Sequence, residues 1–426
     1  MVCIVHPQRG LVFIVRMSKI PVVFLVLWLL LPLGSVAEGA DFIVKPRIST
    51  TMEYNDNVTE TQKPEGDYVW IVKPGLSATY EHSRVLFDLS YDFENKKYLD
   101  QVKSDEQNNY LSARGEIEAI KDLFFIDTSD SYTKVYTNAT RGDVEEGDTT
   151  TGTTDQNTFD FQPYFVIPLQ ERTSLRTGGG LRDIWYSSEG SIDKRIYNLF
   201  ANVSHELTDR WVFSGEAGFQ KQDPRWEEGG FERYNFKLES TYSYAEGSSI
   251  QVSFSPTYTD YKGENSSNKQ YNPYSIKITH AFSPTIVGSI SSAMNFTEDP
   301  QSSDTKNQYV HQVSLNGEYE RGNISAIVAY YDYETDESVN RTTYWRPNIR
   351  GTHNLSERLS LNYSAYMNLY TNPDCKKTLF SLLGLRYSLS ESTSASLSYR
   401  FKLNDEQADG EDYRSNSIGL TLTWRR

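Results

Sequence analysis

The chain has 426 residues, of which 38% are hydrophobic and 13% aromatic, and a formal net charge of -15. So acidic a protein would repel nucleic-acid phosphates, which excludes a nucleic-acid partner. Beyond the N-terminal region, no stretch reaches the roughly 18 consecutive apolar residues of a membrane-spanning helix. A low mean hydropathy still fits a membrane barrel, because its strands present only every second residue to lipid.

Residues 1–37 have the three parts of a secretory signal peptide. A positive segment precedes the apolar run Ile20–Leu33, and Ser35-Val36-Ala37 supplies the small residues of a cleavage site. The apolar run is shorter than the roughly 20 residues that a spanning helix needs. We therefore predict a signal peptide that is cleaved from the mature domain of residues 41–426, with Met17 as an alternative start of translation.

From residue 41 onward, apolar residues recur with a period of two, which is typical of β-strands. In the run Val85–Phe93, for example, every odd position is apolar or aromatic. Similar runs cover residues 111–119, 359–369 and 395–403. They are longer than the roughly 5–6 residues of ordinary globular strands, and they suit tilted strands that cross a membrane.

The connections between these runs are short at one end and long at the other. The nine short turns are at residues 81–84, 121–122, 170–172, 208–210, 245–247, 283–284, 320–322, 356–358 and 390–392. Long polar connections alternate with them, and Asn138–Gln156 is the longest. Short periplasmic turns and long extracellular loops are typical of barrels in the bacterial outer membrane.

Further strands over about Phe42–Tyr54 and Tyr413–Trp424 complete the pattern. We predict an all-β fold, a closed transmembrane antiparallel up-and-down β-barrel of about 20 strands, within a range of roughly 18 to 22. The barrel must be closed because an open sheet edge in hydrocarbon would leave its amides without hydrogen-bond partners.

Two motifs near the start of this domain carry a family resemblance. The first strand ends in Tyr54-Asn55-Asp56-Asn57-Val58, and the second contains Val72-Lys73-Pro74-Gly75-Leu76. Within about Phe42–Tyr80, the sequence resembles a porin-like outer-membrane β-barrel family associated with exosortase and exopolysaccharide systems. The resemblance implies a barrel with a link to polysaccharide export and its components as partners, and it carries no catalytic residues.

The last strand suggests further partners. Ile418, Leu420, Leu422 and Trp424 alternate toward the C-terminus, like the signal that barrel-assembly machinery recognises. Such signals usually finish on an aromatic residue, whereas two arginines follow Trp424 here. Outer-membrane lipid and lipopolysaccharide would surround the strands.

The sequence contains no convincing enzyme constellation: it has no nucleophile-elbow, zinc-protease or P-loop motif. We predict no catalysis, no cofactor and no metal site. The acidic segment Asp143–Asp148 lacks the spacing of a calcium-binding loop, and Cys375 is alone once the signal peptide is removed. A barrel-embedded hydrolase using His311 is the least favoured alternative, because His311 has no carboxylate beside it in sequence.

A function would depend on the polar faces of the strands, which we expect to line the lumen. The candidate lumen charges are Arg114, Glu116, Glu118, Arg176, Arg182, Lys237, Lys277, Arg346, Arg350, Arg386, Arg400 and Lys402. Basic rings would favour anions, although opposed charges could simply pair across the lumen. So wide a barrel encloses water unless a loop plugs it, and Asn138–Gln156 is our first candidate for a constriction.

These observations predict a passive porin-like channel, or a secretion conduit, for a hydrophilic solute linked to exopolysaccharide export. The alternative is a structural or adhesive surface barrel whose lumen is plugged.

Overall fold

The computed structural model describes most of residues 41–426. The described residues are 41–141, 152–225, 229–262, 268–302, 305–334, 341–372, 375–406 and 412–426. The predicted signal peptide over residues 1–37 and the acidic segment Asp143–Asp148 lie outside these residues.

Almost every described residue outside the turns is in a strand. The strands are β1 (Asp41–Asn55), β2 (Asp67–His82), β3 (Val85–Tyr98), β4 (Glu106–Ile120), β5 (Phe124–Tyr136), β6 (Thr153–Gln170), β7 (Thr173–Tyr186), β8 (Lys194–Thr208), β9 (Trp211–Pro224), β10 (Phe231–Ala245), β11 (Ser248–Phe254), β12 (Thr257–Tyr261), β13 (Asn268–Tyr271), β14 (Tyr274–Ser283), β15 (Ile286–Glu298), β16 (Thr305–Tyr319), β17 (Gly322–Glu334), β18 (Arg341–Asn354), β19 (Leu359–Asn372), β20 (Lys376–Ser388), β21 (Thr393–Glu406) and β22 (Tyr413–Arg425). A short 3-10 helix, η2 (Ala139–Arg141), follows β5.

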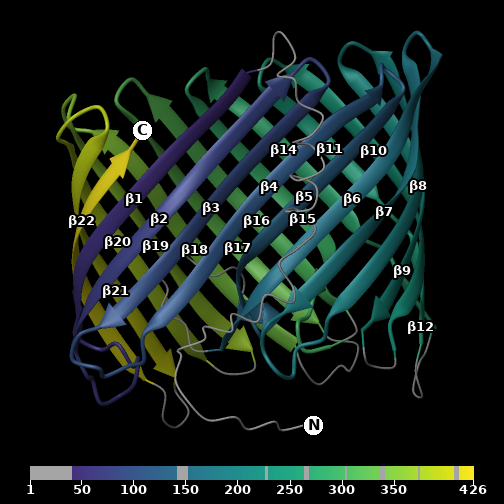
Figure 1. Cartoon of the computed structure of the whole chain (residues 1–426). Helices are drawn as coiled ribbons and strands as arrows, with labels where there is room; N and C mark the ends of the chain where they lie inside the picture. Colours follow the sequence, from purple (N-terminus) through teal and green to yellow (C-terminus); the bar gives the residue numbers. More distant parts are fainter. Residues whose placement is uncertain are drawn as a thin grey trace, which may run out of the picture. The chain divides into compact units, whose positions relative to one another are not determined.

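The strands form one closed antiparallel barrel (Figure 1). Neighbours in sequence pair with one another, and β1 closes the ring by pairing with β22, where Tyr54 lies opposite Ile418. The 22 strand segments make twenty spanning strands, because β11 with β12 and β13 with β14 are halves of single strands. Pro256 and Pro273 lie at these two breaks, where proline supplies no N–H to the ladder.

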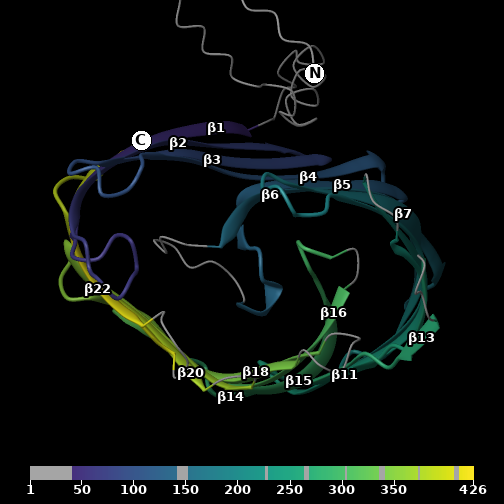
Figure 2. The same cartoon turned by 90° about the horizontal axis from the view of Figure 1, so that it is seen from below.

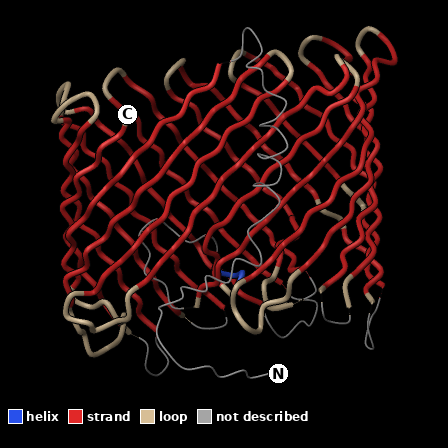
Figure 3. Tube along the Cα trace, viewed as in Figure 1, coloured by secondary structure: helices blue, strands red, loops and turns tan. Residues whose placement is uncertain are grey.

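The predicted asymmetry of the connections is confirmed. All nine short turns lie at one end of the barrel, and the long connections lie at the other (Figure 3). The predicted first and last strands are β1 and β22, and both reach the short-turn end at the terminus of the domain. The short-turn end is the periplasmic side, and the long-loop end faces outward.

The pleat separates an apolar outer face from a polar inner one. Leu199, Ile290 and Leu420 are about 60% exposed and lie on the outer face, as the period of two predicts. Residues paired across adjacent strands lie on the same face of the sheet. The register therefore shows, for each strand in turn, which residues face outward and which face inward.

Two segments at the long-loop end extend toward the middle of the ring, and the connection between β1 and β2 lies just inside the wall (Figure 2). One is η2, which belongs to the predicted constriction loop Asn138–Gln156, together with the adjoining end of β5. The other is the tip of the β15–β16 hairpin, which the sequence analysis missed. β15 pairs with β14 only as far as Ala293, and beyond it the described residues of β15 pair with β16 alone.

Candidate functional site

The inner face of the barrel carries the predicted charges. The register places all the candidates on the face opposite the exposed apolar residues: Arg114, Glu116, Glu118, Arg176, Arg182, Lys237, Lys277, Arg346, Arg350, Arg386, Arg400 and Lys402. Their role in selecting a solute stays a prediction.

Most of these charges have a partner beside them on the wall. Arg182 Nε donates to Asp160 Oδ1 at 2.7 Å on the adjacent strand, and Lys237 Nζ lies 2.5 Å from Glu239 Oε2 on the same strand. Arg176 lies 3.9 Å above the ring of Tyr164. The ion pairs described for the candidate residues thus join side chains on the same strand or on nearby strands. They do not cross the lumen, as opposed charges on facing walls would. Because these side chains are partly exposed, each pair stabilises the fold little.

The motif Tyr54–Val58 forms a clasp between the first and last strands. Asp56 accepts hydrogen bonds from the backbone N (2.7 Å) and Nδ2 (2.8 Å) of Asn416. Asn57 is 1% exposed, and its Nδ2 donates to the Arg414 carbonyl at 3.0 Å. All these contacts cross from β1 and its loop to β22, so the motif fastens the closure of the barrel.

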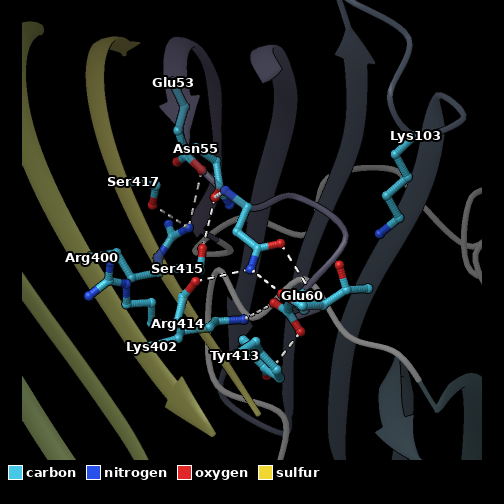
Figure 4. Close-up of polar contacts among 12 residues, drawn as sticks. Glu53, Asn55, Glu60, Lys103, Arg400, Lys402, Tyr413, Arg414, Ser415 and Ser417 are labelled. Atoms are coloured by element: carbon cyan, nitrogen blue, oxygen red, sulfur yellow. Dashed lines mark hydrogen bonds and ion pairs between the residues drawn. The ribbon is translucent and has the colours of Figure 1, made fainter. Parts of the chain in front are cut away.

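Ion pairs extend this seam along the inner wall (Figure 4). Arg400 Nη1 lies 3.3 Å from Glu53 Oε1, and Lys402 Nζ lies 2.8 Å from Glu60 Oε1. Tyr413 donates to the other Glu60 oxygen at 3.1 Å. Two of the predicted lumen charges therefore also join the first and last strands: Arg400 binds β1 itself, and Lys402 binds the loop that follows it.

Arg346 on β18 holds η2, which comes from the opposite part of the ring. Its Nη2 donates to the Arg141 carbonyl at 3.3 Å, and its Nε donates to Asn368 Oδ1 at 2.7 Å. Its guanidinium also lies 5.3–5.4 Å from the ring centres of Tyr331, Tyr344 and Tyr366. Hydrogen bonds and aromatic rings together fix this cation, and the cation in turn holds η2 inside the barrel.

Lys194 on β8 anchors the tip of the β15–β16 hairpin. Its side chain is fully buried, and Nζ lies 3.1 Å from Glu298 Oε2 and 2.7 Å from the Asp299 carbonyl. A lysine so completely removed from water must keep these partners, because an unpaired buried charge is costly.

Arg233 on β10 forms a second anchor for the same hairpin. Its Nη2 donates to Thr305 Oγ1 at 2.9 Å, and its guanidinium lies 3.8 Å from the ring centre of Phe296. Sequence reasoning did not select Lys194 or Arg233, although Arg233 has the same strand parity as Lys237. Both residues matter because the β15–β16 hairpin bends inward, and the alternation of apolar and polar residues in the sequence does not show this bend.

The two inward segments leave space between them. A cavity of about 480 Å³ is lined by Tyr136 and Ala139 on one side and by Thr297 and Glu298 on the other, with Arg346 beside them. The long-loop end is therefore narrowed, and its open volume runs between polar and aromatic side chains.

His311 lies on the outer face of β16, away from the lumen. Its Nδ1 is 2.9 Å from Ser292 Oγ, and its ring stacks on Tyr330 at 6.1 Å. No carboxylate hydrogen bond to His311 is present among the described residues, and the strand amides that surround it are committed to the ladder. A hydrolase would need a group that orients the histidine and donors for an oxyanion.

The described parts of the chain contain no group of three or more His, Cys, Asp or Glu side chains that could hold a metal ion. No helix in them has the length and hydrophobicity needed to cross a membrane.

Comparison with known families supports the resemblance seen in the sequence. The model of the family described as "Putative beta-barrel porin 2" matches residues 38–198, which include β1 to β7 and the start of β8. No curated protein matches the sequence. The predicted resemblance to an outer-membrane barrel family is therefore confirmed. The family match does not include the predicted association with exosortase systems, which stays a prediction.

Solved structures share the fold. The FrpB iron transporter from Neisseria meningitidis (F5-1 variant) is similar with a TM-score of 0.51 and 7% identity, over 91% of this chain and 83% of that chain. A mutant of the ferric enterobactin receptor PfeA from Pseudomonas aeruginosa gives a TM-score of 0.50 and 8% identity, over 90% and 80%. At such identities the likeness concerns the fold alone. Together with the family match over residues 38–198, it supports a β-barrel of the bacterial outer membrane that is similar to porins.

Proposed function

We propose that the protein is a passive channel for a hydrophilic solute, narrowed at its outer end by η2 and the β15–β16 tip. The observation that carries the proposal is the polar inner face of a closed barrel in which inward segments leave a cavity of about 480 Å³ between them. An aqueous passage needs such polar walls, and its width and charge set what passes.

The anchors explain how a narrow passage can be kept open. Lys194 fixes the hairpin, and Arg346 fixes η2, each by contacts to a separate part of the wall. Segments held in this way restrict the lumen without needing to close it. Wide barrels either conduct through an open lumen or carry a plug that closes it. The anchored segments here support an intermediate case, a lumen that is narrowed but still open.

The resemblance of the first two strands to an exopolysaccharide-associated family suggests the solute. We therefore extend the proposal to a conduit linked to exopolysaccharide export, with polysaccharide-export components as periplasmic partners. Barrel-assembly machinery would insert it, and lipopolysaccharide would surround its outward-facing strand ends.

A plugged structural or adhesive barrel is the second candidate. It is favoured by the same inward segments, because contacts from β8, β10 and β18 could fill the lumen completely. In that case the long loops, and not the inner face, would carry the function.

Conductance separates the two candidates. Purified, folded protein should produce discrete current steps in planar lipid bilayers, with a conductance well below that of an unobstructed barrel of this size. Correctly folded protein that produces no steps would contradict the channel and favour the plugged barrel. A sample unfolded by heating in detergent is the control for leakage.

A further inference from the structure

A groove lies on the outer face of the barrel at the short-turn end, beside the turn that joins β8 to β9. We call it the turn groove. Its volume is about 700 Å³, within the roughly 300–1,000 Å³ typical of ligand pockets. Side chains of β9, β10 and β11 form its walls, and the turn closes one end. The groove therefore faces lipid, with its closed end toward the periplasm, and the channel proposed above does not use it.

The turn groove exists because one small side chain lies among large ones. Ser240 faces outward on β10, and its partner on β11 is Val252. One outward position nearer the turn, Tyr242 lies opposite Trp211 on β9 and Ile250 on β11. A serine surrounded by aromatic and branched side chains leaves a depression in the lipid-facing surface.

Internal contacts hold one wall of the turn groove in place. Trp211 Nε1 donates to Ser240 Oγ at 2.9 Å, so the indole N–H has its partner within the protein. The Trp211 ring centroid lies 5.6 Å from that of Tyr242 and 5.0 Å from that of Phe213. A wall that is already ordered loses little conformational entropy when a ligand packs on it.

Arg210 places a cation at the closed end of the turn groove. Its backbone is fixed, because its carbonyl accepts a hydrogen bond from Ser243 N at 2.8 Å. Its side chain is exposed and forms no ion pair among the described residues. Asp209 also lines the groove, but Arg172 of the neighbouring turn lies 3.0 Å from its Oδ1. Two cations and one carboxylate therefore surround this end, and Arg210 is available to a ligand.

Other short turns carry an arginine at the same place without such a groove. The carbonyls of Arg84, Arg321 and Arg358 each accept a backbone hydrogen bond from the strand that follows their hairpin, as that of Arg210 does. None of these three residues lines the turn groove. The combination of a cation with an apolar depression thus distinguishes the turn at Arg210.

We propose that the turn groove binds one glycerophospholipid of the periplasmic leaflet, with its phosphate at Arg210 and an acyl chain along Ile250 and Val252. A guanidinium forms strong charge-assisted hydrogen bonds to phosphate oxygens. Trp211 and Tyr242 are amphipathic and suit the level at which the headgroup meets the chains. The short-turn end is the periplasmic side, so phospholipids of that leaflet are the molecules that reach this groove.

Other occupants match the turn groove less well. A free phosphate would use Arg210 and leave the apolar walls uncovered. An uncharged apolar molecule would cover the walls and leave Arg210 without an anion. A second copy of the chain would have to bring both an apolar ridge and an acidic group to the same place. A phospholipid carries both parts in one molecule.

The test measures lipid binding to the folded full chain in detergent by native mass spectrometry. Three probes separate the parts of the ligand: dioleoylphosphatidylglycerol, dioleoylglycerol, which lacks the phosphate, and glycerophosphoglycerol, which lacks the acyl chains. Arg210→Gln removes the cation, and Ser240→Leu fills the groove. The matched controls are Arg321→Gln at another short turn and Ala201→Leu at an exposed outer-face position of β8.

Wild-type protein should retain one molecule of phosphatidylglycerol and bind both partial probes more weakly. Arg210→Gln should weaken phosphatidylglycerol several-fold and leave dioleoylglycerol unchanged, because it removes the phosphate contact alone. Ser240→Leu should weaken both lipids, and neither control should change them. Because Arg210 lies in an exposed turn, its variant keeps the test decisive even when Ser240→Leu does not fold.

Three results would overturn the lipid site. The first is equal binding of phosphatidylglycerol and dioleoylglycerol to wild type. The second is an equal loss of affinity in the groove variants and their controls, which would mean that lipid coats the wall without a particular site. The third is a dimer that forms in wild type and not in Ser240→Leu, since a second chain would then cover the groove.

Discussion

The two ends of the lumen are built differently. Toward the short-turn end, inner charges such as Arg114 and Lys277 are exposed, and the Arg114 side chain is 72% exposed. Toward the long-loop end, inner polar residues such as Lys194, Asp67 and Asn57 are almost fully buried. The first region is a solvated wall, and the second is a packed polar network that restricts the opening.

This difference indicates where substitutions matter. A solvated charge interacts mainly with water and is replaceable at little cost, whereas a buried polar group depends on its particular partners. The long-loop end should therefore control both stability and conductance, and the short-turn end should modulate only the electrostatic field in the passage.

The largest effect is expected for Lys194→Met. The change leaves Glu298 without its cation, and loss of one member of a buried pair costs about 3–5 kcal/mol. The loss of stability should lie near the lower end of this range, because the Glu298 side chain is 28% exposed and water can solvate its charge. Urea unfolding followed by tryptophan fluorescence measures this loss, and single-channel recording should show a several-fold higher conductance. Lys45→Met at the opposite end should change neither.

The clasp at the barrel seam should give the next largest effect. Asn57→Ala removes bonds to the Thr61 and Arg414 carbonyls and should lower the free energy of unfolding by about 1–3 kcal/mol. The matched control is Asn354→Ala, an exposed position at the short-turn end. If both variants unfold at the same urea concentration, the motif is not a clasp.

A smaller effect on conductance is expected for Arg346→Ala. The variant releases η2 from β18 but leaves the hairpin anchored, so its conductance should lie between those of wild type and Lys194→Met. Arg350→Ala removes the same charge from the same strand without touching η2. An equal rise in both variants would mean that charge, and not the hold on η2, sets the conductance.

The smallest effect is expected at the short-turn end. Arg386 faces Ser360 and Ser396 on the inner wall, so Arg386→Gln removes a charge and no described ion pair. The free energy of unfolding should change by less than about 0.5 kcal/mol. The reversal potential in a salt gradient should shift modestly toward cation preference. A large loss of stability would contradict the description of this region as a solvated wall.

The sequence predicted the wall and named the loop Asn138–Gln156, which contains η2, as a constriction, but it did not predict that the β15–β16 tip enters the lumen. Alternation and turn spacing specify the strands because lipid and water impose a period of two on every strand that separates them. The β15–β16 hairpin keeps apolar residues with a period of two at Met294 and Phe296 after leaving the wall, so this part of its sequence looks like a lipid-facing surface. A charged Glu298 at an outer-face position was the available signal.

The functional importance of single residues was also only partly predictable. Arg346 was selected as a lumen charge, but its hold on η2 depends on a segment distant in sequence. The motif Tyr54–Val58 was noted as a family resemblance, yet its clasp function required knowing that Asn416 lies beside it on β22. Contacts of this kind follow from closure of the ring, which no local pattern records.

The central claim is that anchored inward segments narrow an open channel. The most direct measurement compares the single-channel conductance of wild type with that of the double variant Lys194→Met, Arg346→Ala in the same salt. The account predicts small, discrete steps for wild type and markedly larger steps for the folded double variant. No steps from either protein, or equal steps from both, would contradict it.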